Sequence, residues 1–474
     1  MSTGQTTATS ISIMDGGGWD ATFFCQVGDE AIFRELNTAL RRYREMSDGI
    51  IHQLSISHEV AARSESLFFS DVNDASLLSR KLELNIARSA EALEQNVFVL
   101  EKILGPFPCI ALSEVEVETD QESFVGVEGI HAAADGYGSH RLARYISPYN
   151  ARSDFQDDEE NYNSASHIIT HLTRDWSADS ASIRKDTYGW IVDQLWAHHI
   201  GGEDGTQARV LVPGAGTGRL AYDLAFAAID DGEEETSKPH YPFAVEAVDC
   251  SIPMATAAYH LLRQKEEPFK AFPFVSNPFT NEVSSEKRYN SIYFPESSVI
   301  DTLKRIGGET QQSKPHNLTY VIGDFVRLFS MPSRHEAFDY VATCFFLDTA
   351  SNLFEYLLTI RHAIRPKGLW VNLGPVQWHR NAQLQPSADE LKDLVILAGF
   401  DIIVWEISED LVPYRHPDDV KSGTRAEFYR PLRFVVKSRD ENLLSPQHSL
   451  QVSIEKLRAT TGRQSLLKDH PAEE

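Results

Sequence analysis

An apolar run that ends in three closely spaced glycines constrains the fold of this chain most strongly. Residues 208–225 read ARVLVPGAGTGRLAYDLA, in which the run RVLVP is followed by Gly214, Gly216 and Gly218. The run has the character of a buried strand, and the residues after the glycines have the spacing of a helix. Because glycine has no Cβ, the turn between the two lets the backbone approach a ligand closely. The stretch therefore predicts a strand–turn–helix unit that binds a ligand over the turn.

Further short apolar runs alternate with helical stretches as far as about residue 438. The strand-like runs are FAVEAVD, LTYVIGD, FDYVATCFF, GLWVNLGP, DIIVWEIS and PLRFVVKS. Strands that alternate with crossover helices form a mostly parallel sheet covered by helices on both faces. We therefore predict an α/β, Rossmann-like fold whose ligands bind beyond the carboxyl ends of the strands.

Two classes of enzyme use such a glycine turn, and the spacing distinguishes them. Dinucleotide enzymes carry G-x-G-x-x-G, but the third glycine position is Arg219 in this chain. The spacing G-x-G-x-G followed by Arg-Leu resembles the usual opening of class I S-adenosylmethionine (SAM) methyltransferases. This resemblance implies a seven-stranded, mostly parallel sheet and SAM as the cofactor.

The ends of the following strands carry side chains that suit the parts of SAM. Asp249 ends the second strand, where a carboxylate can accept hydrogen bonds from both ribose hydroxyls. Asp324 and Phe325 follow the third strand and suit the adenine amino group and ring face. The fourth strand ends in TCFFLDT, where the methyl donor and its acceptor would meet. The alternative is that these are ordinary turn glycines and helix-capping aspartates.

The composition of the 474 residues narrows the function. Lys and Arg number 44 against 69 Asp and Glu, a net charge of −25, which argues against nucleic acid as a partner because phosphate binding needs a basic surface. The four cysteines are far apart and favour a reducing compartment. No apolar stretch approaches the ~20 residues of a membrane helix, and the start lacks the features of a signal peptide. We expect no membrane association and a location in the cytoplasm or the nucleus.

Four parts are expected along the chain. Helical periodicity in residues 30–105 predicts two or three helices. The sequence assigns no chemistry to these helices, which could cover the active site or form the interface of a homodimer. The expected parts are a disordered tail (1–20), a helical N-terminal region with an acidic insertion (21–206), a SAM-dependent methyltransferase domain with an insertion at about 263–315 (207–440), and a C-terminal tail (441–474).

Several stretches resemble the carnosine N-methyltransferases. They are YNSASHIITHLTRDWS, VLVPGAGTGRLA, GDF, ATCFFLDTASN, IRPKGLWVNLGPVQWH and RFVVK, all within about residues 140–440. TCFFLDTA followed by WVNLGP is the more specific part, because all class I enzymes share the glycine turn. The resemblance implies transfer of a methyl group from SAM to an imidazole nitrogen of carnosine, a histidine-containing dipeptide, which gives anserine.

The resemblance also implies a cofactor site. Arg174 suits the cofactor carboxylate because its planar guanidinium binds carboxylates through two hydrogen bonds; the alternative is a surface ion pair with Asp175 or Asp179. The family has Gln where this chain has His171. Together with the glycine turn, the predicted cofactor-binding residues are His171, Arg174, Gly214, Gly216, Gly218, Asp249, Asp324, Phe325 and Cys344.

On the acceptor side, the family has a run of tyrosines before the last strand, where residues 427–429 of this chain read EFY, so the acceptor preference can differ. The tyrosines could hydrogen-bond the substrate or only pack in the core, and the histidine of VQWH could bind the dipeptide or have a purely structural partner. The predicted substrate-binding residues are Asp348, His379, Tyr414 and Tyr429.

Asp348 is the predicted catalytic residue. We hypothesise that its carboxylate accepts the distal N–H of the substrate imidazole, which would hold the lone pair of the other nitrogen toward the methyl group and stabilise the charge that the ring gains. The alternative is that Asp348 is the N-cap of a helix over TASNLFEYLL.

Other functions fit the same motifs. The acceptor could be a histidine in a protein, or another small imidazole or amine, and the chain could also bind SAM without turnover as an interaction protein. No metal is expected, because His167, His171 and Asp175 share a spacing of four residues but lack a further ligand.

Overall fold

The computed structural model describes residues 22–26, 28–69, 77–107, 110–111, 165–198, 207–226, 243–276, 284–308, 318–417, 428–440 and 454. The stretches predicted as tails, 1–20 and 441–474, lie outside these residues except for residue 454, and so does the acidic insertion at 110–136 except for its first two residues. Glu427, one of the departures from the family pattern, also lies outside them.

A central sheet follows the order β7-β4-β3-β8-β9-β13-β10, and its strands are parallel except β13, which is antiparallel to both of its neighbours. This is the arrangement of the class I methyltransferase fold, so the predicted fold class is confirmed. The strands are β3 (Ala208–Pro213), β4 (Phe243–Asp249), β7 (Leu318–Ile322), β8 (Phe338–Cys344), β9 (Ile364–Gly374), β10 (Phe400–Ile407) and β13 (Leu432–Ser438).

Two short strands from the N-terminal region extend this sheet beyond the seven strands that were predicted. β1 (Thr22–Cys25) pairs in parallel with β7, and β2 (Ile110–Ala111) pairs in parallel with β1, so the described part of the chain contributes nine strands to the sheet. Strands of four and two residues are too short for an alternating pattern to show in the sequence. Cys25 on β1 is disulfide-bonded, which the spacing of the cysteines did not predict.

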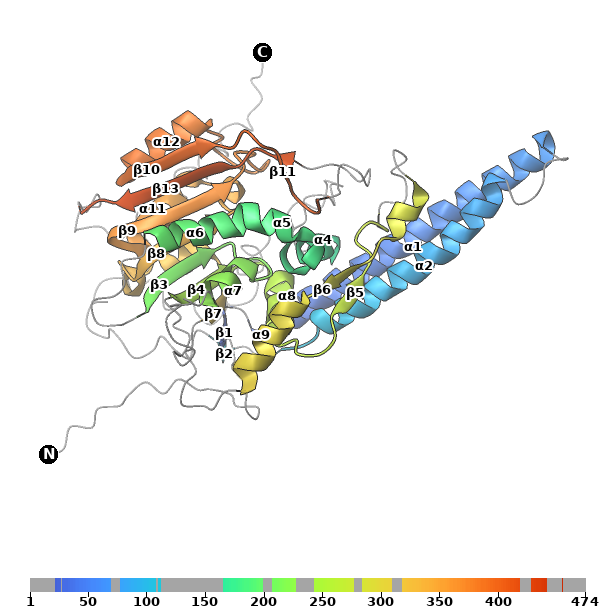
Figure 1. The fold of residues 1–474 in the computed structure, drawn as a ribbon, viewed down its shortest axis with the longest axis horizontal. Coiled ribbons are helices and arrows are strands. Elements are labelled where there is room, and N and C mark those ends of the chain that lie inside the picture. Colours follow the sequence, from blue (N-terminus) through green and yellow to red (C-terminus); the bar gives the residue numbers. More distant parts are fainter. Residues whose placement is uncertain are drawn as a thin grey trace, which may run out of the picture.

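Helices cover both faces of the sheet (Figure 1). Along β3, Val210 and Val212 belong to one buried cluster and Leu211 to another, so both faces of this central strand are buried, as expected of a parallel sheet. The first cluster includes side chains of α6 (Trp190–Ala197), α7 (Arg219–Ala225) and α8 (Ile252–Leu261); the second includes those of α10 (Phe325–Phe329), α11 (Leu353–Ala363) and α12 (Ala388–Leu397).

The helices α1 (Asp29–Phe68) and α2 (Leu78–Ile103) form a long pair that projects away from the sheet (Figure 1). At 1.5 Å per residue the 40 residues of α1 span about 60 Å. The stretch predicted as an insertion contains a two-stranded ribbon of β5 (Phe269–Ala271) and β6 (Ile292–Phe294), in which β5 packs against α2, and the helix α9 (Ser297–Gly308). The Asn96 side chain on α2 donates to the carbonyl of Phe272 (2.9 Å) and accepts from its N–H (2.7 Å).

Between the long pair and the sheet, α4 (Ala165–Trp176), α5 (Ala181–Arg184) and the π-helical turn η6 (Lys185–Gly189) lead into α6. α4 packs against α1 and α8. Its Trp176 is fully buried and donates from Nε1 to the hydroxyl of Thr217 in the glycine turn (3.0 Å). Among the described residues, no helix has both the length and the apolar character needed to cross a membrane.

Candidate functional site

A cavity of about 590 Å³ lies at the carboxyl ends of β3, β4, β7 and β8. The structure therefore brings together side chains that are far apart in the sequence, from α4 to β12 (Phe428–Tyr429). Their roles stay predictions. The predicted residues that line the cavity are His171, Arg174, Gly214, Gly216, Asp249, Asp324, Phe325, Cys344, Asp348, His379, Tyr414 and Tyr429.

The glycine turn forms one wall of the cavity. Gly214 and Gly216 have φ angles of 66° and 54°, in the left-handed region that favours glycine. A Cβ at Gly214 would collide with the ring of Phe346, whereas a Cβ at Gly216 would meet no atom within 4 Å. Gly218, also predicted to bind the cofactor, does not line the cavity; it is the N-cap of α7 and lies beside Ala258.

Gly214→Ala is expected to lower the free energy of unfolding more than Gly216→Ala. Both substitutions place a side chain at a left-handed backbone position, which costs about 1–3 kcal/mol. Only the first also displaces the Phe346 ring. Urea denaturation of the two variants and the wild type measures the difference, and equal losses would show that the contact with Phe346 does not constrain the turn.

Two carboxylates face the cavity from the ends of β4 and β7. Asp249 accepts hydrogen bonds from the N–H of Gly216 (2.7 Å) and of Ser251 (2.8 Å), one on each oxygen, and burial raises the pKa of its carboxyl. Each oxygen keeps a second lone pair for a ligand hydroxyl. Asp324 is the N-cap of α10 and accepts the N–H of Arg327 (2.8 Å), so the capping interpretation is correct for one of its oxygens.

The Arg174 guanidinium lies almost fully buried beside the cavity, with 6% of its residue surface exposed. Its Nε donates to Asp175 Oδ1 (2.6 Å) and its Nη2 lies 3.0 Å from His171 Nδ1. The ring of Tyr414 covers it at 4.8 Å. Its third nitrogen, Nη1, is buried and has no hydrogen-bond partner among the residues that the structure describes. A buried, unpaired N–H donor in a cavity suits an anionic group of a ligand, and a carboxylate fits it directly.

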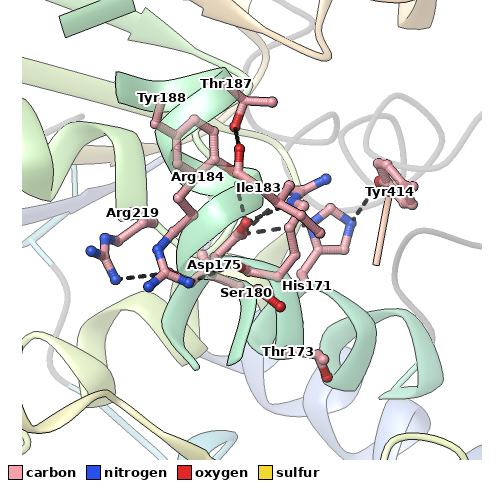
Figure 2. Close-up of polar contacts among 12 residues, drawn as sticks. His171, Thr173, Asp175, Ser180, Ile183, Arg184, Thr187, Tyr188, Arg219 and Tyr414 are labelled. Carbon is pink, nitrogen blue, oxygen red and sulfur yellow. Dashed lines mark hydrogen bonds and ion pairs between the residues drawn. The ribbon is translucent and has the colours of Figure 1, made fainter. Parts of the chain in front are cut away.

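His171 is neutral and its tautomer follows from its neighbours. Burial and the Arg174 charge lower its pKa to about 4. Because a guanidinium only donates, Nδ1 accepts from Arg174 and the proton lies on Nε2. That nitrogen is 3.4 Å from the Tyr414 hydroxyl (Figure 2). His171 thus joins the cofactor side of the cavity to a residue predicted for the acceptor side.

Asp175 lies next to the cavity lining and is a residue whose role sequence reasoning missed, having weighed it as a partner of Arg174 or as part of a metal-ligand set. It accepts from Tyr188 (2.7 Å) and from Thr217 in the glycine turn (2.8 Å), besides pairing with Arg174. Burial alone would raise the pKa of its carboxyl, but the charge of Arg174 outweighs it and lowers the pKa. The carboxylate therefore fixes Arg174 relative to the turn.

At the end of β8 the backbone is strained. Phe345 has a φ of 52°, a conformation that bulky residues rarely adopt and that recurs at functional sites. Its ring makes edge contacts with Tyr414 and Tyr429 at 5.5 Å and 5.7 Å between ring centres. This aromatic wall was not predicted, because no residue pattern marks a left-handed phenylalanine. Burial raises the pKa of the neighbouring Cys344 thiol, which disfavours the reactive thiolate.

Asp348 lies in the 3-10 turn η10 (Leu347–Thr349), and only 7% of its surface is exposed. Burial raises the pKa of its carboxyl to about 7. The interpretation of Asp348 as a helix cap is wrong, because Asn352 is the N-cap of α11 and accepts the N–H of Phe354 (3.1 Å). The N–H of His379 donates to the carbonyl of Asp348 (3.1 Å), so these two predicted acceptor residues lie together.

Among the described residues, no three His, Cys, Asp or Glu side chains gather as they would around a metal ion. The cavity lining combines the guanidinium of Arg174 with the carboxylates of Asp249, Asp324 and Asp348 and with several aromatic rings.

Comparison with known proteins identifies the family. The family model "Carnosine N-methyltransferase" matches residues 152–439, more than half of the chain. The carnosine N-methyltransferase of Schizosaccharomyces pombe is 26% identical over 256 residues, covering 53% of this chain and 62% of that protein. That of Rattus norvegicus is 27% identical over 244 residues, covering 50% and 54%.

The chain thus aligns with about half to three fifths of these relatives' length. Among solved structures, a putative sarcosine dimethylglycine methyltransferase from Galdieria sulphuraria matches 54% of this chain and 85% of its own, with a TM-score of 0.32 and 11% identity. The family match and the strand order agree: the chain belongs to the carnosine N-methyltransferase family, which has the class I SAM-dependent methyltransferase fold.

Proposed function

We propose that this protein transfers a methyl group from SAM to an imidazole nitrogen of a histidine-containing dipeptide, with carnosine as the acceptor to test first. The observation that carries the proposal is that one cavity holds both an unpartnered, buried guanidinium nitrogen of Arg174 and the buried, raised-pKa carboxylate of Asp348. The first suits the carboxylate of SAM and the second suits the ring of the acceptor.

The residues present fit the cofactor. Arg174 Nη1 would bind its carboxylate, Asp249 its ribose hydroxyls, and Asp324 with Phe325 its adenine, while Gly216 leaves room for it over the turn. When bound, SAM supplies a methyl group activated by a sulfonium, so the chain has only to align donor and acceptor.

Asp348 would choose the reactive tautomer of the acceptor. As a carboxylate it accepts the N–H of one imidazole nitrogen, which leaves the lone pair of the other nitrogen free to form the new N–C bond as the C–S bond breaks. The ring gains the positive charge that the sulfonium loses, and the buried carboxylate stabilises it. Release of the N–H proton to solvent then leaves a neutral methylimidazole, with S-adenosylhomocysteine as the other product.

SAM carrying an isotope-labelled methyl group separates the candidate functions. Incubation with carnosine, with free histidine and with a cell extract is expected to label carnosine on an imidazole nitrogen. Label confined to protein would instead support a protein histidine as acceptor. Binding of S-adenosylhomocysteine without label in any of the three would support a non-catalytic SAM-binding protein.

A further inference from the structure

The C-terminus of α4, which carries Arg174 and Asp175, is held by donors from outside the helix. The last four carbonyls of a helix have no partner within it, and cations near them are stabilising. In α4 all four accept hydrogen bonds. The pairs are Ser177 Oγ to Thr173 (2.6 Å), Arg184 Nη1 to Arg174 (2.9 Å), Arg219 Nη1 to Asp175 (2.9 Å) and the backbone N–H of Glu296 to Trp176 (2.8 Å).

Glu296 also joins the two arginines of this set. Its Oε2 accepts from Arg184 Nη2 and its Oε1 from Arg219 Nη2, both at 2.7 Å. The three side chains are largely buried, with 13%, 5% and 10% of the side-chain surface exposed for Glu296, Arg184 and Arg219. In Figure 2, Arg184 and Arg219 lie to the left of Asp175, and Tyr414 lies to its right. In this view the two arginines thus lie on the other side of Asp175 from Tyr414.

Glu296 lies between β6 and α9, in the stretch at about 263–315 that was predicted as an insertion. It does not line the cavity. It is linked to the cavity wall through the backbone of residues 174–176. The carbonyl of Trp176 accepts the N–H of Glu296, and those of Arg174 and Asp175 accept from Arg184 and Arg219, which both pair with Glu296; Arg219 also pairs with Asp223 (2.8 Å).

We propose that Glu296 is a positioning residue for the carboxylate end of the SAM site. This inference rests on the proposed function, since it assumes that Arg174 Nη1 binds the cofactor carboxylate. When the charge of Glu296 is removed, Arg184 and Arg219 lose the carboxylate that pairs with both of them, and the last turn of α4 is held less firmly. The Arg174 guanidinium is then no longer aligned with the cofactor carboxylate. The part of the site that would bind adenosine, at the ends of β4 and β7, keeps its own contacts.

The test compares two ligands that differ at the amino-acid end. S-adenosylhomocysteine carries the carboxylate, and 5′-methylthioadenosine lacks it. For Glu296→Gln, isothermal titration calorimetry is expected to show a rise of at least tenfold in the Kd of S-adenosylhomocysteine and a change of less than twofold for methylthioadenosine. Glu286→Gln removes a pair with Arg88 on an exposed surface of the same stretch and is expected to change neither Kd.

Equal weakening of both ligands by Glu296→Gln would mean a general structural role and would overturn the inference, as would no change in either. If Glu296→Gln does not fold, Glu296→Asp replaces it in the test. The Asp side chain keeps the charge but is too short to reach both arginines, so the Kd of S-adenosylhomocysteine is again expected to rise while that of methylthioadenosine stays nearly unchanged. If Arg174→Lys weakens S-adenosylhomocysteine and neither Glu296 variant does, the inference fails and the proposed function stands. If the wild type binds no S-adenosylhomocysteine, the proposed function itself fails.

Discussion

Replacing Asp348 by Asn is expected to lower kcat for imidazole methylation by about 10²–10⁴-fold, the range typical of a positioned acid–base group. The amide cannot stabilise the positive ring as a carboxylate does. Asp348 is not among the proposed cofactor contacts, so the Kd of S-adenosylhomocysteine should stay near the wild-type value. Steady-state kinetics with labelled SAM, together with calorimetry, measures both effects. Full turnover in the variant would rule out the tautomer role.

The pH profile tests the same assignment. The carboxylate form is the active one, and the pKa of Asp348 is about 7, so wild-type kcat should rise as the pH increases through about 7. In Asp348→Asn the part of this rise that belongs to the carboxyl should be absent. An identical profile in the variant would assign the rise to the ionisation of the acceptor imidazole instead.

The same substitution is expected to stabilise the protein at alkaline pH. A carboxyl whose pKa is raised in the folded state binds its proton more tightly there, so its contribution to stability is lost as the pH rises from about 4 through 7. At pH 8 the Asn variant should therefore be more stable by up to about 4 kcal/mol, at about 1.36 kcal/mol per pKa unit. Thermal melts of the variant and the wild type at pH 4.5 and pH 8 measure the gain, and the difference in stability between the two proteins should be larger at pH 8.

Asp393→Asn is the matched control, because Asp393 lies exposed on α12. It should change stability by no more than about 0.5 kcal/mol at either pH, and leave kcat unchanged. A gain in stability at Asp348 combined with a loss in activity would mark a residue kept for function at a cost to folding.

The sequence predicted those site residues that lie at the carboxyl ends of parallel strands. Asp249 and Asp324 each come directly after a buried run, and parallel strands bring their carboxyl ends to one edge, so their meeting at one cavity could be expected. Arg174 and Asp348 needed the resemblance to a known family, because an arginine in a helix or an aspartate in a turn carries no signal of its own.

What could not be predicted depends on contacts between distant segments or on backbone strain. Thr217 and Asp175 are 42 positions apart, and their hydrogen bond depends on how α4 packs against the turn. Glu296 is 112 positions from Arg184, in a polar stretch with no periodic pattern. The short strand β1 forms because β7 offers a sheet edge, not because TFFC has a strong pattern of its own.

Arg174→Lys is expected to weaken S-adenosylhomocysteine binding by at least about tenfold, because Lys does not replace Arg at a bidentate site. The guanidinium pairs with Asp175 through Nε and Nη2 and still has Nη1 for a ligand. A single ammonium that stays with Asp175 cannot also supply a fixed donor to the cavity. It also loses the contact of the guanidinium with the face of the Tyr414 ring. Calorimetry measures the change, with Arg41→Lys on the exposed surface of α1 as a control that should bind like the wild type.

Arg174→Gln is expected to lower the free energy of unfolding by about 3–5 kcal/mol at pH 7, because it leaves the Asp175 carboxylate buried without its cation. The pKa of Asp175 is lowered in the folded wild type, so its pairing stabilises the fold above about pH 4 and is lost as the pH falls below that value. The difference in the free energy of unfolding between Arg174→Gln and the wild type, measured by urea denaturation, should therefore shrink in acid. Arg174→Lys keeps a positive charge beside Asp175 and should lose less stability at pH 7. If Arg174→Lys binds S-adenosylhomocysteine as tightly as the wild type, the unpaired Nη1 is not the cofactor contact, and the carboxylate must be bound elsewhere in the cavity.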